Sequence, residues 1–234
     1  MIRIGNFFFH YRNALFPLVF VLLFIPGPNL FPTDTLAIAI GLSIAIAGQL
    51  IRAITIGLVY IIRGGRNRQV FAKGLVQTGM FAHCRNPLYV GNVLICLGVG
   101  VTANSLLFLA IGMPFLLFAY SAIIAAEENY LHEKFGQEFE DYCKRVPRWI
   151  PIFSGILQTA QSMDFKWRRL IVKEYGSTFC WMAGVCAVLI KNRWLQVRTF
   201  SDLQIYCLIS TLVLVTLAFA IARYLKKSGT LVAD

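Results

Sequence analysis

The sequence is short of charged residues, and of acidic ones most of all. Charged side chains make up 14% of the 234 residues, with 11 Asp and Glu against 22 Lys and Arg. Hydrophobic residues account for 58%, and the mean hydropathy is +0.67. This composition departs from that of soluble domains and predicts an integral membrane protein.

Histidine and cysteine are too scattered to build a metal or disulfide site. His10, His83 and His132 show no ligand spacing, and the six cysteines include no C-x-x-C pair. We therefore expect no metal site, and reduced cysteines that serve in packing. The glycines of GVGV at 98–101 lie inside an apolar run, which excludes a dinucleotide fingerprint and a soluble Rossmann enzyme.

The net charge of +11 does not indicate a nucleic-acid partner. Lys and Arg gather at the ends of apolar segments instead of forming one basic face. Attraction to the anionic headgroups of membrane lipids accounts for that distribution. We therefore expect contact with membrane lipids and none with nucleic acid.

Six apolar segments approach the length of about 20 residues that a membrane-spanning helix needs. They are 14–25, 36–62, 88–101, 106–126, 179–190 and 203–225. The first and fifth are short, and the fifth could instead be re-entrant or lie at the interface. We predict an all-α, polytopic transmembrane bundle of about six spans (five to six), whose first span is retained and not cleaved as a signal peptide.

The distribution of Lys and Arg predicts the orientation of these spans. A cytosolic N-terminus puts 18 of the 22 basic residues on the cytosolic side and leaves Lys191, Arg193 and Arg198 outside. The positive-inside rule favours this arrangement, with both termini in the cytosol. The long polar connections 63–87 and 127–177 are then cytosolic, so we expect the cofactor pocket on that side.

The second long connection begins with the sequence EENYLHEKFGQEFEDYCKRVPRWIP at 127–151. Its apolar residues recur at helical spacing. They are Leu131, Phe135, Phe139 and Tyr142. We predict a helix with one apolar stripe, bent near Gly136, that needs the membrane surface or the 63–87 connection as a partner.

The stretch HCRNPLYVGN at 83–92 opens the third apolar segment. Asn is a favoured N-cap and Pro a favoured first helical residue, so Asn86 and Pro87 predict the start of a helix. Capping accounts neither for Tyr89 nor for the glutamate pair that opens the later polar connection.

The ordered set GLVQTGMFAHCRNPLYVGN and EENYLHEKFGQEFEDYCKRVPRWIP resembles the isoprenylcysteine carboxyl methyltransferase and phospholipid methyltransferase families of integral membrane enzymes. The family pattern is T-G-x-[YF], R-[HN]-P-x-Y-x-G, then E-E-x-x-L, F-G, Y and a closing V-P-type segment. The matching residues are Thr78, Gly79, Phe81, Arg85, Asn86, Pro87, Tyr89, Gly91, Glu127, Glu128, Leu131, Phe135, Gly136, Tyr142, Val146 and Pro151. The resemblance covers about 70–151.

The resemblance implies S-adenosylmethionine as the cofactor and a lipid-embedded or small hydrophobic acceptor. The cofactor-binding residues that it implies are Lys73, Gly74, Leu75, Val76, Phe81, Asn86, Pro87, Leu88, Tyr89 and Glu127. A helix N-terminus suits the carboxylate of this cofactor, and Leu75, Val76 and Phe81 suit its flat ring. Glu128 is the candidate base for an amine acceptor. Arg148 either positions the acceptor or binds headgroup phosphates.

Three positions differ from better-known members of the family. Asn86 stands where they have His, Phe81 where many have Tyr, and Ile123 where the eukaryotic enzymes have an Arg that contacts the substrate carboxylate. The acceptor is therefore open among a lipid amine, a thiol and a carboxylate.

The rest of the chain carries weaker signals. Arg52 lies deep in the second span, where it must snorkel or pair, or contact a cofactor carboxylate or lipid headgroup. Residues 165–177 predict an interfacial amphipathic segment. We divide the chain into N-terminal spans at 1–69, a methyltransferase core at 70–153 and an extension at 154–234, whose spans pack, gate the site or form a dimer.

Two other functions remain open. Membrane sterol reductases resemble the same helical module but bind NADPH, and Arg63, Arg66 and Arg68 could receive its 2′-phosphate. A non-enzymatic membrane scaffold is the other alternative, and it predicts that replacing Glu127 or Tyr89 leaves function unchanged.

Overall fold

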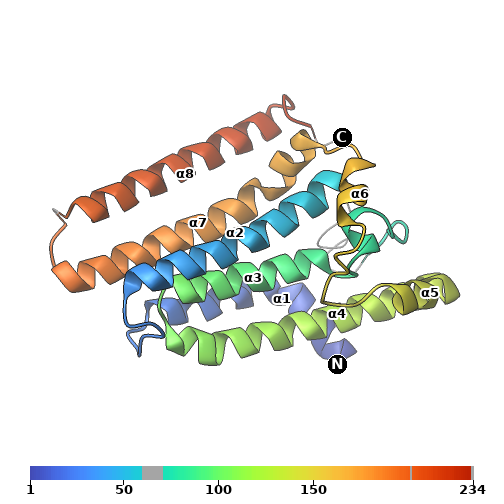
Figure 1. The fold of residues 1–234 in the computed structure, drawn as a ribbon, viewed down its shortest axis with the longest axis horizontal. Coiled ribbons are helices and arrows are strands. Elements are labelled where there is room, and N and C mark those ends of the chain that lie inside the picture. The colour runs from blue at the N-terminus through green and yellow to red at the C-terminus, as the bar shows by residue number, and fades with distance from the viewer. Residues whose placement is uncertain (60–70, 201, 233–234) are drawn as a thin grey trace.

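The computed structural model describes residues 1–59, 71–200 and 202–232, and these residues form helices and connections without a strand (Figure 1). The long helices are α1 (Ile2–Phe20), α2 (Asp34–Leu58), α3 (Pro87–Thr102), α4 (Met113–Phe135), α7 (Trp167–Val197) and α8 (Leu203–Lys227). The short ones are α5 (Gln137–Arg145) and α6 (Ile156–Gln161), the 3-10 turns η1 (Val21–Phe24) and η2 (Gly79–Ala82), and the π-helical turn η3 (Phe108–Gly112). The prediction of an all-α architecture is confirmed for the described residues.

Four helical stretches are long and apolar enough to cross a membrane. They are Ile2–Phe24, Asp34–Leu58, Phe108–Phe135 and Leu203–Lys227. The other two predicted spans also form helices, but α3 has only 16 residues, and α7 falls short in apolarity over its 31 residues. The predicted count of about six spans is therefore not confirmed.

The first helix begins earlier than the predicted start at Ala14. Its polar residues interrupt the apolar run in the sequence, yet α1 already begins at Ile2. Phe8 and Phe9 are buried against Ala119, Ala122 and Ile123 of α4, so tertiary packing extends the helix toward the N-terminus.

Helices α2 and α3 approach each other through glycines. A Cβ atom at Gly48 of α2 would lie 2.7 Å from the carbonyl oxygen of Gly91, and one at Gly98 of α3 would lie 2.5 Å from the backbone nitrogen of Ala45. Small residues at such positions let two helix backbones pack closely, as is common between membrane helices.

Aromatic rings join α1 to α4 and η3. The ring centroids of Phe16 and Tyr120 are 5.1 Å apart, and those of Phe20 and Phe108 are 5.6 Å apart.

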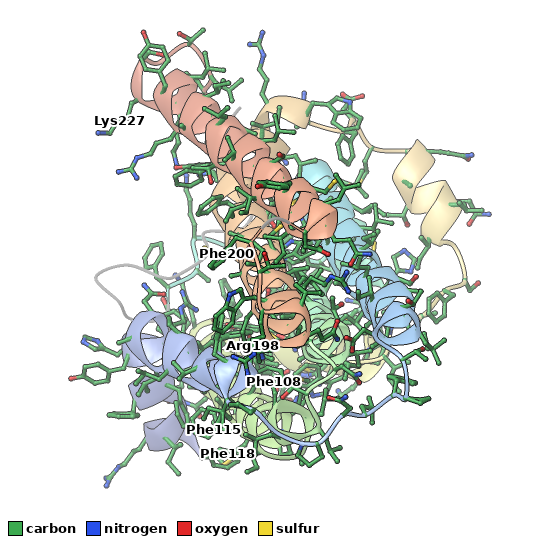
Figure 2. The ribbon with its side chains drawn as sticks, turned by 90° about the vertical axis from the view of Figure 1, so that its left-hand side faces the viewer. Phe108, Phe115, Phe118, Arg198, Phe200 and Lys227 are labelled. Atoms are coloured by element: carbon green, nitrogen blue, oxygen red, sulfur yellow. The ribbon has the colours of Figure 1, made fainter. Side chains whose placement is uncertain are left out.

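Figure 2 looks at the end of the bundle where α7 turns into α8, with Arg198 and Phe200 labelled at that turn.

The two ends of the bundle differ. One end holds the connections from α1 to α2, from α3 to α4 and from α7 to α8, whereas the other holds both chain ends, α5 and α6 (Figure 1). At the first end, Asn104 accepts hydrogen bonds from the N–H groups of Leu30 and Phe31, at 3.0 and 2.8 Å, and donates to Asp34 at 3.0 Å. This buried side chain ties two connections together.

The fifth predicted span is one continuous helix without a re-entrant turn. Residues 167–177 belong to α7 and are not a separate segment, and α7 lies beside α8 (Figure 1). The polar face of this stretch has a partner inside the protein, because the buried Glu174 binds Arg52 of α2.

Candidate functional site

A cavity of about 1340 Å³ runs between α1, α3, α4 and α7. Residues 71–76, together with Leu131 of α4 and Phe139 and Tyr142 of α5, line it near the end of the bundle that carries both termini. Leu23, Val99 and Val188 line it deeper in the bundle. One cavity therefore joins the connecting segments at that end to the apolar interior.

Backbone hydrogen bonds join the two motif-bearing segments beside this cavity. The N–H of Arg85 donates to the carbonyl of Pro147, and the N–H of Ile152 donates to the carbonyl of His83, both at 2.9 Å. The hydroxyl of Tyr142 donates to the carbonyl of Phe81 at 2.7 Å. Segments that are about sixty residues apart in the sequence thus form one structural unit.

Asn86 stands at the predicted N-cap position of α3, but its side chain does not cap the helix. The Asn86 amide donates to the carbonyl of Arg148 at 3.2 Å instead. The capping role predicted for this side chain is therefore wrong, because residues 147–152 lie alongside and compete for the amide. Pro87 is the first residue of α3, as predicted.

Tyr89 and Glu127 contact each other across the cavity wall. The Tyr89 hydroxyl donates to Oε1 of Glu127 at 2.9 Å, and both residues line the cavity. Tyr89 follows the start of α3, whereas Glu127 lies in the last third of α4. The contact joins the R-[HN]-P-x-Y element to the E-E element of the sequence pattern.

Glu128 lies between two arginines. Arg148 forms a two-pronged contact with its carboxylate, through Nε at 3.2 Å and through a second nitrogen, and the Arg85 guanidinium lies 3.6 Å away. Glu128 lines the cavity and is largely buried, whereas Arg148 is 46% exposed and does not line it. The side chain of Arg148 contacts the cavity lining through Glu128, and its backbone carbonyl contacts it through Asn86.

The apolar stripe predicted for 127–151 is divided between two helices. Gly136, at a φ of +50°, separates α4 from α5. Such a backbone conformation favours glycine. Phe139, Tyr142 and Val146 are buried against Leu75, so the connection before α3 is the partner of the stripe, as one of the two alternatives predicted.

The structure brings nearly all the predicted site residues to the one cavity. All ten predicted cofactor-binding residues line it, as does Glu128, and Arg148 is the exception. Their chemical roles stay predictions. Arg63, Arg66 and Arg68, which kept an NADPH site open, lie outside the described residues.

Sequence reasoning missed the walls that α1 and α7 contribute. Arg12, Phe16 and Phe20 line the cavity from α1, and Phe179 and Trp181 line it from α7. No motif marks these residues. The sequence indicates them only through the aromatic residues of two predicted helical segments.

Arg52 pairs inside the protein instead of snorkelling. Its Nε donates to Glu174 at 2.9 Å and a terminal nitrogen donates at 2.8 Å, with 5% and 3% of the two side chains exposed. Gln49 also donates to Glu174, at 3.4 Å, and accepts from the Trp181 indole at 2.9 Å. Arg52, Asn92 and Trp181 line the cavity, so this network borders the site.

Burial shapes the chemistry of two groups near the motif. The Cys84 side chain is fully buried and donates to the carbonyl of Trp149 at 3.4 Å. Burial raises the pKa of this thiol, and it also raises the pKa of the Tyr142 hydroxyl.

Within the described residues, no group of three or more His, Cys, Asp or Glu side chains could hold a metal ion.

Comparison with known proteins gives a family profile and several curated relatives. The profile of a family described as phospholipid methyltransferase matches residues 35–138. The protein-S-isoprenylcysteine O-methyltransferase of Schizosaccharomyces pombe is 35% identical over 97 residues, which are 40% of this chain and 38% of that protein. No solved structure matches.

Two bacterial relatives are named for metal resistance. The cobalt-zinc-cadmium resistance protein CzcN of Cupriavidus metallidurans is 34% identical over 115 residues, 49% of this chain and 48% of the relative. The nickel-cobalt-cadmium resistance protein NccN of Alcaligenes xylosoxydans xylosoxydans is 38% identical over 80 residues, 34% of this chain and 37% of the relative. The matches thus span less than half of each curated relative.

Proposed function

We propose, because the profile of a phospholipid methyltransferase family matches residues 35–138, that the chain is an integral membrane methyltransferase that uses S-adenosylmethionine. The acceptor in this proposal is a lipid or a small hydrophobic molecule that reaches the cavity from the bilayer.

One observation carries the proposal. The ten residues that the resemblance implies for the cofactor come from the 71–76 connection, η2, α3 and α4, and all of them line one cavity. Nothing in their sequence spacing alone requires Lys73 and Glu127 to share a wall. Their convergence is what a cofactor site in this family requires.

The cavity fits the parts of this cofactor. The side chain of Asn86 is turned away from the N-terminus of α3, which leaves that helix end to receive a carboxylate. Glu127, held by Tyr89, suits an ammonium or hydroxyl group. Leu75, Val76 and Phe81 supply apolar surface for the adenine ring.

The size and lining of the cavity also leave space for an acceptor. About 1340 Å³ exceeds the roughly 300–1,000 Å³ of common ligand pockets. The walls from α1 and α7 are rich in aromatic and small apolar side chains. We infer that the cofactor occupies the part near residues 71–76 and that the acceptor occupies the part between α1 and α7.

The bound cofactor supplies an electrophilic methyl group, and the protein aligns the reactants and excludes water. Methyl transfer is an in-line displacement that gains from alignment and from exclusion of water. Apolar walls exclude water, and the Tyr89–Glu127 hydrogen bond fixes a polar group between them. Glu128 accepts contacts from Arg85 and Arg148, so we assign it to shaping the cavity wall and keep a proton-accepting role only for an amine acceptor.

The orientation proposed from the basic residues suits this division. We propose that the end of the bundle with residues 71–86, α5 and α6 faces the cytosol, where the soluble cofactor is available. A water-soluble maleimide applied to intact spheroplasts should then fail to label a cysteine placed at Gln137, and label one placed at Phe200.

Binding of cofactor products tests the proposal directly. S-adenosylhomocysteine and NADPH are titrated by calorimetry into the purified full chain in neutral detergent. We expect S-adenosylhomocysteine to bind at micromolar concentration and NADPH not to bind. Glu127→Gln should weaken that binding by about tenfold or more, since it removes a charge-assisted contact.

Glu133→Gln is the matched control. Glu133 lies on the same helix but is exposed and outside the cavity, so its replacement should leave binding unchanged. NADPH binding alone would favour the reductase alternative. Binding of neither ligand to folded protein would favour the scaffold.

A further inference from the structure

We propose that Arg12 binds an anionic group, a phosphate or a carboxylate, of the molecule that occupies the cavity. This inference rests on the proposed function, because it adds a ligand contact within the same cavity. It concerns α1, which lies outside the segment that the family profile matches.

Arg12 lies within a helix of membrane-spanning length and apolarity, Ile2–Phe24. A charged side chain inside such a helix is costly unless it pairs or faces a water-filled cavity, and it then marks a functional site by default. Arg12 is half-buried and lines the cavity. Its location is therefore explained by something that the cavity holds.

The other cations of the cavity differ from Arg12. Arg52 is paired with Glu174, Arg85 lies 3.6 Å from Glu128, and Lys73 is exposed to solvent. In the residues that the structure describes, no ion pair or hydrogen bond engages the guanidinium of Arg12. Among the described cavity cations that are shielded from solvent, Arg12 is thus the one whose charge no acid offsets through an ion pair.

The guanidinium of Arg12 is nevertheless held in place. Its Cζ atom lies 4.4 Å from the ring centroid of Phe9, which is buried between α1 and α4. Stacking on an aromatic face leaves the donors at the edge of the guanidinium available. Those donors match the two oxygens of a carboxylate or phosphate.

Glu127 provides the opposite charge in the same cavity. It accepts a hydrogen bond from Tyr89, and among the described residues no ion pair joins it to Arg12. A cation and an anion that line one cavity without contact suit a ligand that carries both charges. The amino acid end of the cofactor and a zwitterionic lipid headgroup both have this chemistry.

Two binding measurements on the full chain in neutral detergent distinguish these sources. Calorimetry gives the affinity for S-adenosylhomocysteine. Protection of Cys180, an exposed cysteine that lines the cavity, from a maleimide gives the affinity for dodecyl phosphate, with dodecanol as the uncharged probe. The variants are Arg12→Gln, Arg12→Lys and the control Arg3→Gln, which removes an exposed cation of the same helix outside the cavity.

Arg12→Gln should weaken the binding of one of the two anions by about tenfold or more. Dodecanol should still protect Cys180 as in the wild type, and Arg3→Gln should change neither affinity. Weaker binding of dodecyl phosphate identifies an acceptor phosphate as the partner of Arg12, and weaker binding of S-adenosylhomocysteine identifies the cofactor carboxylate. Unchanged affinity for both anions, or an equal loss for dodecanol, would overturn the inference.

If Arg12→Gln does not fold, Arg12→Lys provides the test, because lysine keeps the charge but not the two-pronged geometry of the guanidinium. We expect Arg12→Lys to bind the anion about threefold more weakly. An unchanged affinity in Arg12→Lys would overturn the inference. The proposed function fails separately, when wild-type protein does not bind S-adenosylhomocysteine.

Discussion

Tyr89 and Glu127 show how a single hydrogen bond can join two sequence motifs. The Tyr89 hydroxyl is the recorded donor to the Glu127 carboxylate, so this contact orients the acid toward the cavity. Its role is positioning, and its loss should cost less than loss of the acid itself.

We therefore expect Tyr89→Phe to weaken S-adenosylhomocysteine binding by about three- to tenfold, which corresponds to roughly 1 kcal/mol for one hydrogen bond. Calorimetry on the purified chain measures it. Tyr130→Phe, on α4 outside the cavity, serves as the control. An unchanged affinity in Tyr89→Phe would show that Glu127 needs no orienting partner.

The burial of Cys84 can be tested by the reactivity of its thiol. Because burial raises the pKa of this thiol, it stays protonated and unreactive at neutral pH. N-ethylmaleimide at pH 7.5 should label the exposed Cys180 and Cys207 first and Cys84 only after denaturation. Raising the pH toward 9 should increase Cys84 labelling only weakly, since its pKa lies above the ordinary value of 9.0. Peptide mass spectrometry reads each site, and early labelling of Cys84 would contradict the buried geometry.

At the scale of helix pairs, α2 and α3 pack closely against each other. The glycines at this contact leave no space for a side chain. Gly48→Leu should destabilise the protein by about 1–3 kcal/mol through overpacking, and lower the melting midpoint by several degrees. Gly184→Ala in α7 is the control, because a Cβ there meets open space. A thermal scan in detergent compares the two, and equal midpoints would refute the packing argument.

The turn from α7 to α8 depends on a carboxylate. The Arg193 side chain donates to Asp202 and, with the N–H groups of Ile205 and Gln204 that Asp202 also accepts from, lowers the pKa of this carboxyl. A lowered pKa in the folded state means that the stabilisation is present above the unfolded value of about 3.9 and is lost as pH falls through the folded value. The protection factors of the backbone amides at the start of α8, measured by hydrogen exchange relative to the intrinsic rate at each pH, should therefore fall on acidification toward pH 3. Asp202→Asn, which keeps a capping side chain, should lose that pH dependence.

The sequence predicts where helices form better than where they begin. Apolar runs located α2, α3 and α8 within a few residues, whereas α4 is displaced from the predicted 106–126 because Phe108–Gly112 forms the turn η3 and the helix continues to Phe135. The start of α1 was missed because His10 and Arg12 break the run, and only packing against α4 shows that Phe8 and Phe9 belong to a helix. The bend at Gly136 was predictable, since glycine within an amphipathic pattern is a local signal.

Across the whole molecule, the Arg52–Glu174 pair ties α7 to the segment 35–138 that the family profile matches. Glu174→Ala would leave a buried arginine without its acid, and we expect a loss of about 3–5 kcal/mol. Replacing both residues, Arg52→Met with Glu174→Leu, should restore most of that stability, because no charge is then buried alone. Unfolding in denaturant measures both variants. A double variant no more stable than Glu174→Ala would contradict this account.

The candidate site was predictable only in part for the same long-range reason. The motif residues were found through resemblance to a family, and they line the cavity. Glu174 lay in a stretch expected to be polar and interfacial, and no local pattern could pair it with Arg52. The walls from α1 and α7 depend on how the whole bundle closes, which residue spacing does not encode.

The separation between Arg52 and Glu174 also matters during synthesis. Glu174 is translated 122 residues after Arg52, when α2, α3 and α4 have already left the ribosome. Until then, the nascent α2 carries a charge whose carboxylate does not yet exist. We therefore expect stable insertion of α2 to wait for α7, and a ribosome stalled before residue 174 to leave an intermediate with an unpaired buried charge.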